Sequence, residues 1–203
     1  MVKIHYVYDP LCGWCYGASP VIKLLLRADG VEALLHPGGL FFNKKVEPSL
    51  REHILIADKR IQTLTNIEFG EPYKKRVETD ENFILDSYRA IQAIHAFEHL
   101  GRDPLTMLFA IQTAHYVKGL NVSDNYTIEA IAAEHNVLPQ DWHNSMSQCK
   151  SNVRESILVT QQLINHHRLT GYPSILMEKQ GQFTHVDLNK YHQNPMNILS
   201  LIR

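Results

Sequence analysis

Residues 2–20 read VKIHYVYDPLCGWCYGASP, and they decide the fold that the sequence predicts. The first seven of these residues are rich in Val, Ile and Tyr, a composition that favours a β-strand, and the Asp9-Pro10 pair ends it. Two cysteines, Cys12 and Cys15, follow directly, with two residues between them. The stretch therefore places a C-x-x-C pair immediately after a strand.

A helix is expected to begin at about Cys12 or Cys15 and to run to Ala28. Pro20 lies inside it and should kink it, because proline lacks the N–H group that the helical ladder needs. Residues 31–36 then predict a second short strand. A strand, a helix and a second strand in this order favour an α/β domain.

The middle of the chain predicts a helical block that interrupts this α/β unit. After Pro37, roughly a hundred residues show helical periodicity with almost no strand signal. The expected helices cover about residues 50–64, 86–100, 103–119 and 128–135, then one long helix after Pro139 with Trp142, Met146, Cys149, Val153, Ile157 and Ile164 on one face.

After Gly171 the pattern returns to that of a sheet. The expected elements are strands over residues 173–179 and 182–187, a hairpin turn at Gln180-Gly181 between them, and a short helix over residues 195–202. The end of the chain thus supplies the strands that complete the α/β unit.

Composition and charge exclude several classes of protein. The 203 residues carry 20 Lys and Arg against 21 Asp and Glu, so a net charge of -1 gives no reason to expect nucleic acid or an anionic membrane as partner. Three cysteines are too few for a disulfide scaffold, and no apolar run is long enough to span a membrane. The N-terminal residues lack the pattern of a secretory signal, so we expect a cytoplasmic location.

The C-x-x-C pair carries the chemistry. Two cysteines three positions apart at the start of a helix lie close enough to form a small disulfide ring, and the free N–H groups there stabilise a thiolate on the first. We expect Cys12 to be the nucleophile. Cys15, one turn further along the helix, should be more buried and protonated, which suits a resolving thiol.

A zinc site is the alternative for the same cysteines. His95 and His99 form an H-x-x-x-H pair on a predicted helix, but they lie about eighty residues from the cysteines, whereas zinc fingers keep their ligand pairs much closer. Cys149 falls on the apolar face of its helix and is interpreted as a core residue.

Two roles for Asp9 stay open from the sequence alone. Its carboxylate, just before the cysteine turn, can accept hydrogen bonds from backbone N–H groups or oppose ionisation of the thiols. For a buried acid that assists the resolving thiol, the residue that we name is His5 on the first strand.

Gly171-Tyr172-Pro173-Ser174 precedes the third strand. On its own, a proline at this point is a simple strand entry, because its missing N–H falls outside the ladder. Together with a C-x-x-C pair after the first strand, Pro173 occupies the place where a thioredoxin-like fold has a cis-proline beside its active-site sulfurs.

The stretches YDPLCGWCYGASP (8–20) and TGYPSILM (170–177) closely resemble the DsbA-like disulfide oxidoreductases, in particular their FrnE-like branch. The resemblance covers nearly the whole chain. It implies an α/β, thioredoxin-like fold (βαβ…ββα) in residues 1–46 and 150–203, interrupted by an all-helical insertion domain in residues 47–149. It also implies Cys12 as nucleophile, Cys15 as resolving thiol and Pro173 as the cis-proline.

Some residues at the site depart from the better-known members. Gly13-Trp14 stands between the cysteines and should tune their redox properties, and bulky Tyr172 before the proline should shape the substrate groove, with Tyr16 as a further contact. The related kappa-class glutathione transferases and chromene-carboxylate isomerases share the architecture but carry Ser in place of the cysteine pair.

The sequence therefore predicts a thiol–disulfide oxidoreductase or protein-disulfide isomerase that works through a mixed disulfide. Its partners would be protein or small-molecule thiols and disulfides, recycled by glutathione or a thioredoxin-type protein, with no cofactor, metal, nucleic acid or membrane. The direction of the redox reaction cannot be read. A redox-independent, chaperone-like peptide-binding protein and a zinc-binding protein are the alternatives.

Overall fold

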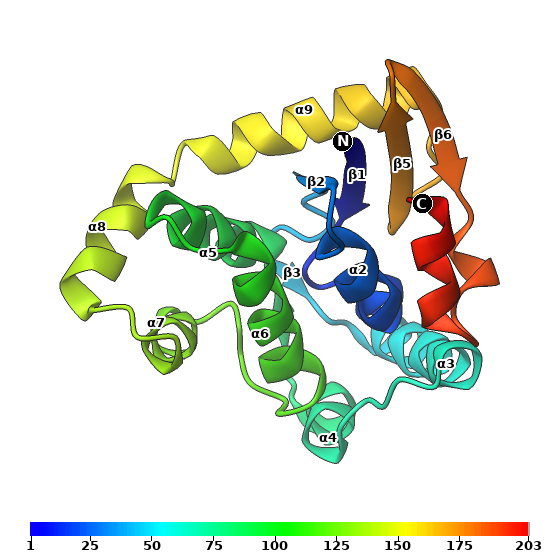
Figure 1. The fold of residues 1–203 in the computed structure, drawn as a ribbon. Helices are drawn as coiled ribbons and strands as arrows, with labels where there is room; N and C mark the ends of the chain where they lie inside the picture. Colours follow the sequence, from blue (N-terminus) through cyan, green and yellow to red (C-terminus); the bar gives the residue numbers. More distant parts are fainter. Residues whose placement is uncertain (203) are drawn as a thin grey trace.

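A computed structural model describes residues 1–202 (Figure 1). In chain order the elements, with η for 3-10 helices, are β1 (Val2–Tyr8), α1 (Gly13–Gly17), α2 (Ser19–Leu26), β2 (Val31–Pro37), β3 (Lys44–Lys45), α3 (Pro48–Thr65), α4 (Glu71–Thr79), β4 (Ile84–Leu85), α5 (Ser87–His99), α6 (Pro104–Tyr116), α7 (Asn125–Glu134), α8 (Pro139–Gln148), α9 (Asn152–His167), β5 (Ser174–Lys179), β6 (Gln182–Val186), η1 (Leu188–Lys190) and η2 (Pro195–Leu201).

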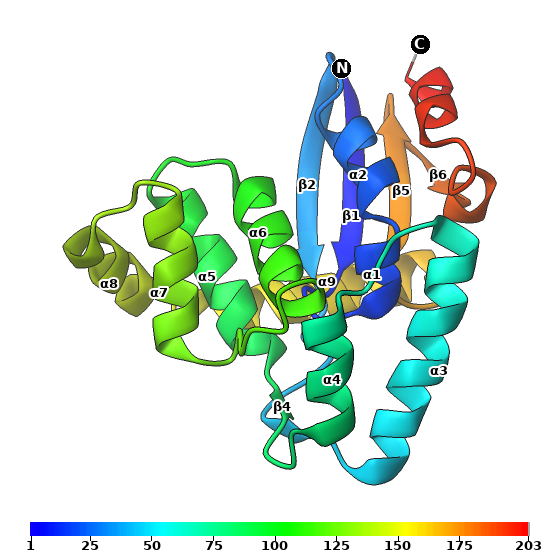
Figure 2. The same cartoon turned by 90° about the horizontal axis from the view of Figure 1, so that it is seen from below.

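The main sheet has the strand order β2-β1-β5-β6. β1 runs parallel to β2 and antiparallel to β5, and Tyr6 lies between Leu35 on one side and Ile175 on the other. Figure 2 shows α2 on one face of this sheet and α9 on the opposite face. Because β1 is central and covered on both faces, all its residues except Lys3 are buried.

Helices α3 to α8 form a second body beside the sheet, and α5 contacts α6, α7, α8 and α9. The apolar core is continuous between the two bodies, because Ile4 and Tyr6 of β1 belong to the same cluster as Phe97 and Leu108 of α5 and α6. The helical body and the sheet thus share one hydrophobic core.

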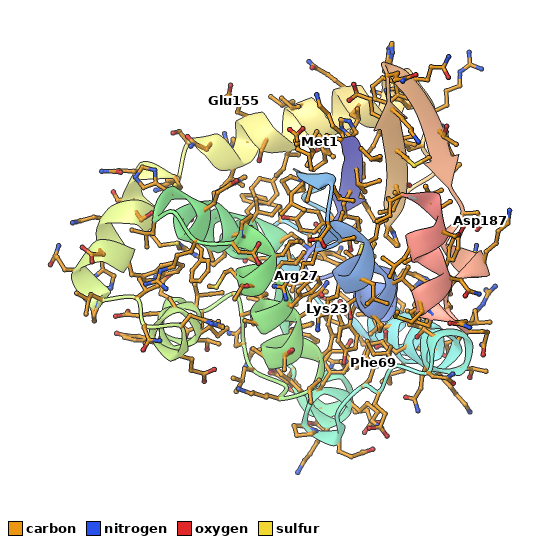
Figure 3. The ribbon with its side chains drawn as sticks, viewed as in Figure 1. Met1, Lys23, Arg27, Phe69, Glu155 and Asp187 are labelled. Atoms are coloured by element: carbon orange, nitrogen blue, oxygen red, sulfur yellow. The ribbon has the colours of Figure 1, made fainter. Side chains whose placement is uncertain are left out.

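Helix α2 also joins the helical body through its polar side. Figure 3 labels Lys23 on α2 and Arg27 directly after it, and both contact residues at or next to α6. The Lys23 ammonium lies 4.7 Å from the centre of the Phe109 ring, and the Arg27 guanidinium donates to the Asp103 carboxylate at 2.9 Å. This ion pair is exposed, so it orients α2 more than it stabilises the fold.

Several local predictions from the sequence are confirmed. β1 has the predicted bounds, the first helix is interrupted at Ala18, two residues before Pro20, and the Asp86 carboxylate caps α5 by accepting from the N–H groups of Tyr88 and Arg89. The hairpin between β5 and β6 turns at Gln180 and Gly181, which both have positive φ. Each of these signals is local, and for this reason the sequence alone reveals it.

The single long helix predicted after Pro139 is wrong. The chain forms two helices, α8 and α9, separated at residues 149–151. A turn in which the Asn152 N–H donates to the Cys149 carbonyl replaces the helical bond there. Residues 149–151 contain neither glycine nor proline, and the apolar face of the sequence continues across them. The sequence therefore contains no signal of the break.

Two further expectations need correction. The insertion is not all-helical, because β4 lies within it and pairs antiparallel with β3. A ladder of two residues on each strand is too short to leave a period-two pattern in the sequence. The closing helix is a 3-10 helix, η2, and the boundaries at residues 47 and 149 stay a prediction.

No helix in residues 1–202 has the length and apolar character to cross a bilayer.

Protonation of His36 should make the fold sensitive to acid. Burial, together with the neighbouring His5 ring, lowers the pKa of His36 from 6.5 to about 4. As the pH falls, His36 is protonated in the unfolded chain before it is protonated in the folded protein. The contribution of neutral His36 to the free energy of unfolding is therefore complete above pH 6.5 and is lost as the pH falls towards 4. Between about pH 7 and about pH 4.5, the urea midpoint should fall less in His36→Gln than in the wild type. Equal losses in both proteins contradict the prediction, and exposed His99→Gln is the matched control.

Candidate active site

Cys12 and Cys15 lie at the start of α1, directly after β1. Cys12 is the N-cap residue of α1, and Cys15 is one turn further along it. Both are free thiols; Cys12 is 7% exposed and Cys15 is fully buried. The Cys12 thiol donates to the Tyr172 carbonyl with an S–O distance of 3.7 Å, and the Cys15 sulfur accepts from the Asp9 N–H at 3.5 Å.

The surroundings of Cys15 keep it protonated. Burial raises the pKa of the Cys15 thiol well above its ordinary value, and the adjacent Cys12 raises it further. The sequence-based expectation of a more buried, protonated second cysteine is confirmed. The two cysteines thus differ: Cys12 is slightly exposed, whereas Cys15 is fully buried and stays a thiol.

The Tyr172–Pro173 peptide bond is cis, as the family resemblance implies. The Tyr172 ring packs against Gly38 at the end of β2, and its hydroxyl donates to the Gly38 carbonyl at 3.3 Å. A Cβ atom at position 38 would lie 2.2 Å from this ring, so only glycine leaves room for it. This contact fixes the backbone carbonyl that faces Cys12.

Asp9 joins four segments of the chain at this site. Its carboxylate accepts from the Leu11 N–H at 2.9 Å, the Leu40 N–H at 2.6 Å and the Ser87 hydroxyl at 2.8 Å. Burial raises the pKa of this carboxyl, and the hydrogen bonds oppose the rise. The bond from the Asp9 N–H lowers the pKa of the Cys15 thiol, whereas the charge of the Asp9 carboxylate raises it, so both roles left open by the sequence apply.

His5 does not belong to the thiol site. One ring nitrogen of His5 bonds to His36 at 3.0 Å and the other to Glu178 at 3.2 Å. The buried acid whose backbone contacts Cys15 is Asp9. The guess that named His5 is therefore wrong, because its position on a buried strand does not reveal which face of the sheet it occupies.

Two hollows lie at the site, and Cys12 lines the smaller one. A pocket of about 460 Å³ lies on the side of Pro173, with Arg168, Ser174, Asn189 and His192 among its lining residues. A smaller cavity of about 160 Å³ lies between Cys12 and the helical body, and its walls are mostly apolar. Trp14 lines both hollows, so this residue of the C-x-x-C motif forms the wall between them.

Tyr16 lies away from both hollows. Its ring stacks on Tyr116 and meets Phe69 edge-on, and its hydroxyl donates to the Glu68 carbonyl at 2.8 Å. These contacts occupy the whole side chain in packing α1 on the helical body. The substrate contact predicted for Tyr16 stays a prediction without geometric support.

The glycines of the motif allow α3 to approach α1 closely. A Cβ at Gly13 would lie 2.9 Å from the Asp58 carboxylate, and one at Gly17 would lie 2.5 Å from Ile61. Sequence reasoning missed Asp58, although a signal existed, because it interrupts the apolar face that Ile54 and Ile61 define on the same helix. Gly13 is thus a packing position as well as a spacer between the cysteines.

The histidine pair of the zinc alternative has other contacts. His95 bonds to the Ser156 hydroxyl at 3.0 Å and lies 4.0 Å from the Glu98 carboxylate, while His99 is exposed. Within residues 1–202, no three His, Cys, Asp or Glu side chains come together to hold a metal ion. Cys149 is 3% exposed and packs in the core, as predicted.

The fold has close parallels among solved structures. Cytosolic disulfide reductase DsbM from Pseudomonas aeruginosa is 30% identical, with 98% of this chain and 96% of that chain covered and a TM-score of 0.90. A second structure of DsbM, with GSH, is 29% identical at the same coverage and TM-score.

The chain belongs to the DsbA-like thiol–disulfide oxidoreductases. It is an enzyme of thiol–disulfide exchange, as the sequence predicts. The FrnE-like branch stays a prediction.

More distant structures share the fold alone. Pseudomonas aeruginosa DsbA is 13% identical, with 99% of this chain and 80% of that chain covered and a TM-score of 0.55. A 2-hydroxychromene-2-carboxylate isomerase is 11% identical, with coverage of 98% and 95% and a TM-score of 0.62, which agrees with the architecture expected for that group. No family model and no curated protein sequence matches the chain.

Removal of the Asp9 carboxylate should destabilise this oxidoreductase strongly. Asp9→Ala leaves the N–H groups of Leu11 and Leu40 and the Ser87 hydroxyl without their acceptor, which should lower the free energy of unfolding by about 2–4 kcal/mol. Asp9→Asn keeps one oxygen and should lose roughly half as much.

Urea denaturation at neutral pH measures both effects. The exposed Asp29→Ala is the matched control and should change the free energy of unfolding by less than about 0.5 kcal/mol. An Asp9→Ala protein as stable as the wild type would show that these hydrogen bonds do not hold the site together.

Proposed function

We propose that this oxidoreductase acts as a cytoplasmic disulfide reductase, with Cys12 as nucleophile, Cys15 as resolving thiol and glutathione as the recycling thiol. The observation that carries the proposal is the inequality of the two cysteines. Cys12 is the more exposed of the two and contacts the carbonyl of Tyr172, a residue that lines the pocket along Pro173, whereas Cys15 is fully buried and protonated.

The forward half-reaction moves two electrons to the substrate. The Cys12 thiolate attacks one sulfur of the substrate disulfide, so a Cys12–substrate bond forms, the substrate S–S bond breaks and one substrate thiolate leaves. Cys15 then loses its proton to that thiolate or to solvent and attacks the Cys12 sulfur. The second substrate thiolate leaves, and a Cys12–Cys15 disulfide remains.

Two glutathione molecules would return the enzyme to its dithiol form. The first thiolate attacks the Cys12 sulfur, which gives a Cys12–glutathione disulfide and releases Cys15, and Cys15 takes up a proton. The second attacks the glutathione sulfur of this mixed disulfide. Oxidised glutathione then leaves, and the Cys12 thiolate is free again.

The pocket beside Pro173 suits a short peptide thiol. Pro173 presents a backbone edge without an N–H group that could compete for the sulfur, and the rings of Trp14 and Tyr172 lie among the pocket walls. Arg168 offers a guanidinium to the carboxylates that glutathione carries. A structure of the relative DsbM with GSH supports this choice of partner.

The proposed direction rests on the relative and on redox chemistry. The relative at 30% identity is described as a cytosolic disulfide reductase. A glutathione pool kept reduced, as in the cytosol, drives the Cys12–Cys15 pair towards its dithiol form. Protein-disulfide isomerisation uses the same Cys12 thiolate and is the secondary activity that we expect.

Substitution of each cysteine separates the proposed roles. In an insulin-reduction assay with glutathione, Cys12→Ser should lose activity by at least about 100-fold, because a hydroxyl cannot replace the thiolate. Incubated with a disulfide substrate in the absence of glutathione, Cys15→Ser should accumulate a mixed disulfide at Cys12, visible by mass spectrometry, because the resolving thiol is missing. Cys149→Ser is the control and should keep activity within about twofold.

Full activity of Cys12→Ser contradicts the mechanism. Peptide holding that persists unchanged in a protein lacking both Cys12 and Cys15 would instead favour the redox-independent, chaperone-like alternative.

Arg168 should affect glutathione binding more than catalysis. Arg168→Gln removes one charged contact to a carboxylate, so the KM for glutathione should rise about 3- to 10-fold while kcat stays within about twofold. Steady-state kinetics at varied glutathione concentration measures both constants. Arg154→Gln, near the start of α9 and outside this pocket, is the control. An unchanged KM in Arg168→Gln argues against this pocket as the glutathione site.

A further inference from the structure

Asp58 is a buried acid at the thiol site that the proposed mechanism does not use. It lies on α3 and is 6% exposed. One carboxylate oxygen faces Gly13, where a Cβ atom would lie at 2.9 Å, and the other accepts from the Tyr73 hydroxyl at 2.8 Å. Burial raises the pKa of this carboxyl to about 7, and the bond from Tyr73 opposes the rise.

Asp58 shares the inner cavity with the nucleophile. Cys12, Gly13 and Asp58 all line this space of about 160 Å³, and the Tyr116 ring completes it. Burial raises the pKa of the Tyr116 hydroxyl well above its ordinary value, and charges on Tyr73, Cys12 and Asp58 raise it further. The carboxyl and the thiol are therefore neighbours that line the same cavity.

Asp58 also reaches a second pocket on the outside. This pocket of about 630 Å³ lies between α3 and α4, and Lys59 and Lys74 are among its other lining residues. Because Asp58 lines both the inner cavity and the outer pocket, its proton can exchange with solvent while the fold stays closed.

The titratable groups around Asp58 come from every element packed against it. They are Cys12 at the start of α1; His53, Lys59 and Arg60 of α3; Glu68 in the following loop; Tyr73, Lys74, Arg76 and Glu78 of α4; and His115 and Tyr116 of α6. Burial lowers the pKa of His115 to about 3, so it stays neutral. The lysines lie at the outer pocket, where solvent screens them.

We propose that Asp58 is a positioning residue of the thiol reaction, whose change of charge with pH controls how stable the Cys12 thiolate is and hence how readily the cysteine pair is oxidised. The proposal rests on the proposed role of Cys12 as nucleophile. It assigns to the helical body a direct part in the chemistry of the thioredoxin-like half.

The charges on Cys12 and Asp58 are linked, because each disfavours the other. In the reduced enzyme a Cys12 thiolate disfavours a second negative charge on Asp58, whereas the Cys12–Cys15 disulfide is neutral and does not. Reduction therefore raises the affinity of Asp58 for its proton. By reciprocity, an ionised Asp58 destabilises the reduced form, so the pair should be oxidised more readily at high pH than a neutral residue at position 58 would allow.

The test compares Asp58→Asn with the wild type in equilibrium with reduced and oxidised glutathione. At about pH 5, Asp58 is neutral in both redox states, and the constant for oxidation should differ between the two proteins only by a fixed offset. At about pH 9, the constant of the wild type should exceed that of Asp58→Asn by a further ~10-fold, with the transition near neutral pH. A purely structural role gives the same ratio at every pH.

Two variants keep the test decisive. Glu52→Gln removes a charge from the exposed face of the same helix and should follow the wild type at every pH. Tyr73→Phe removes the hydroxyl that favours the ionised carboxyl, so the transition should move to higher pH. If Asp58→Asn does not fold, the Tyr73→Phe shift decides the question.

The outcomes separate this inference from the proposed function. A ratio of wild type to Asp58→Asn that is constant from about pH 5 to about pH 9, or an unshifted transition in Tyr73→Phe, overturns the role of Asp58 while Cys12 stays required. Full activity of Cys12→Ser overturns both.

Discussion

The burial of one carboxylate, that of Asp9, holds the active site together. Asp9 has no exposed surface, yet its two oxygens accept from the cysteine turn, from the loop after β2 and from the start of α5. A buried acceptor of this kind is costly unless all its bonds form at once. The sheet, the C-x-x-C turn and the helical body must therefore assemble together, and the geometry around Cys15 is a product of that assembly.

The active site also requires that helices α1 and α3 approach each other closely, at positions where α1 has glycines and hence no side chains. Gly13 and Gly17 have no Cβ atoms, so α1 leaves space at these two positions. Asp58 and Ile61 of α3 fill that space. Gly13 inside the redox motif and Gly17 just after it thus also make a packing surface. A larger residue at position 13 would push away a carboxyl that faces the nucleophile, so the choice of residue between the cysteines acts on the site through a neighbouring helix as well as directly.

The sequence predicts what is local and misses what depends on packing. The C-x-x-C turn, the Asp86 cap, the Gln180-Gly181 hairpin and the cis bond before Pro173 have local or family-specific signals, and the structure has each of them. The break between α8 and α9 and the two-residue ladder have no such signal. Asp58 does have a signal, because it interrupts the apolar face of Ile54 and Ile61, but its position beside Gly13 depends on how α3 packs against α1.

The break between α8 and α9 has a practical consequence, because Cys149 lies in it, 3% exposed. An alkylating reagent reaches this sulfur only when the junction opens. Once Cys12 has been blocked, the rate of labelling at Cys149 reports the frequency of local opening in the helical body under native conditions. Cys149, which takes no part in the proposed chemistry, is therefore a natural probe of local unfolding in the helical body.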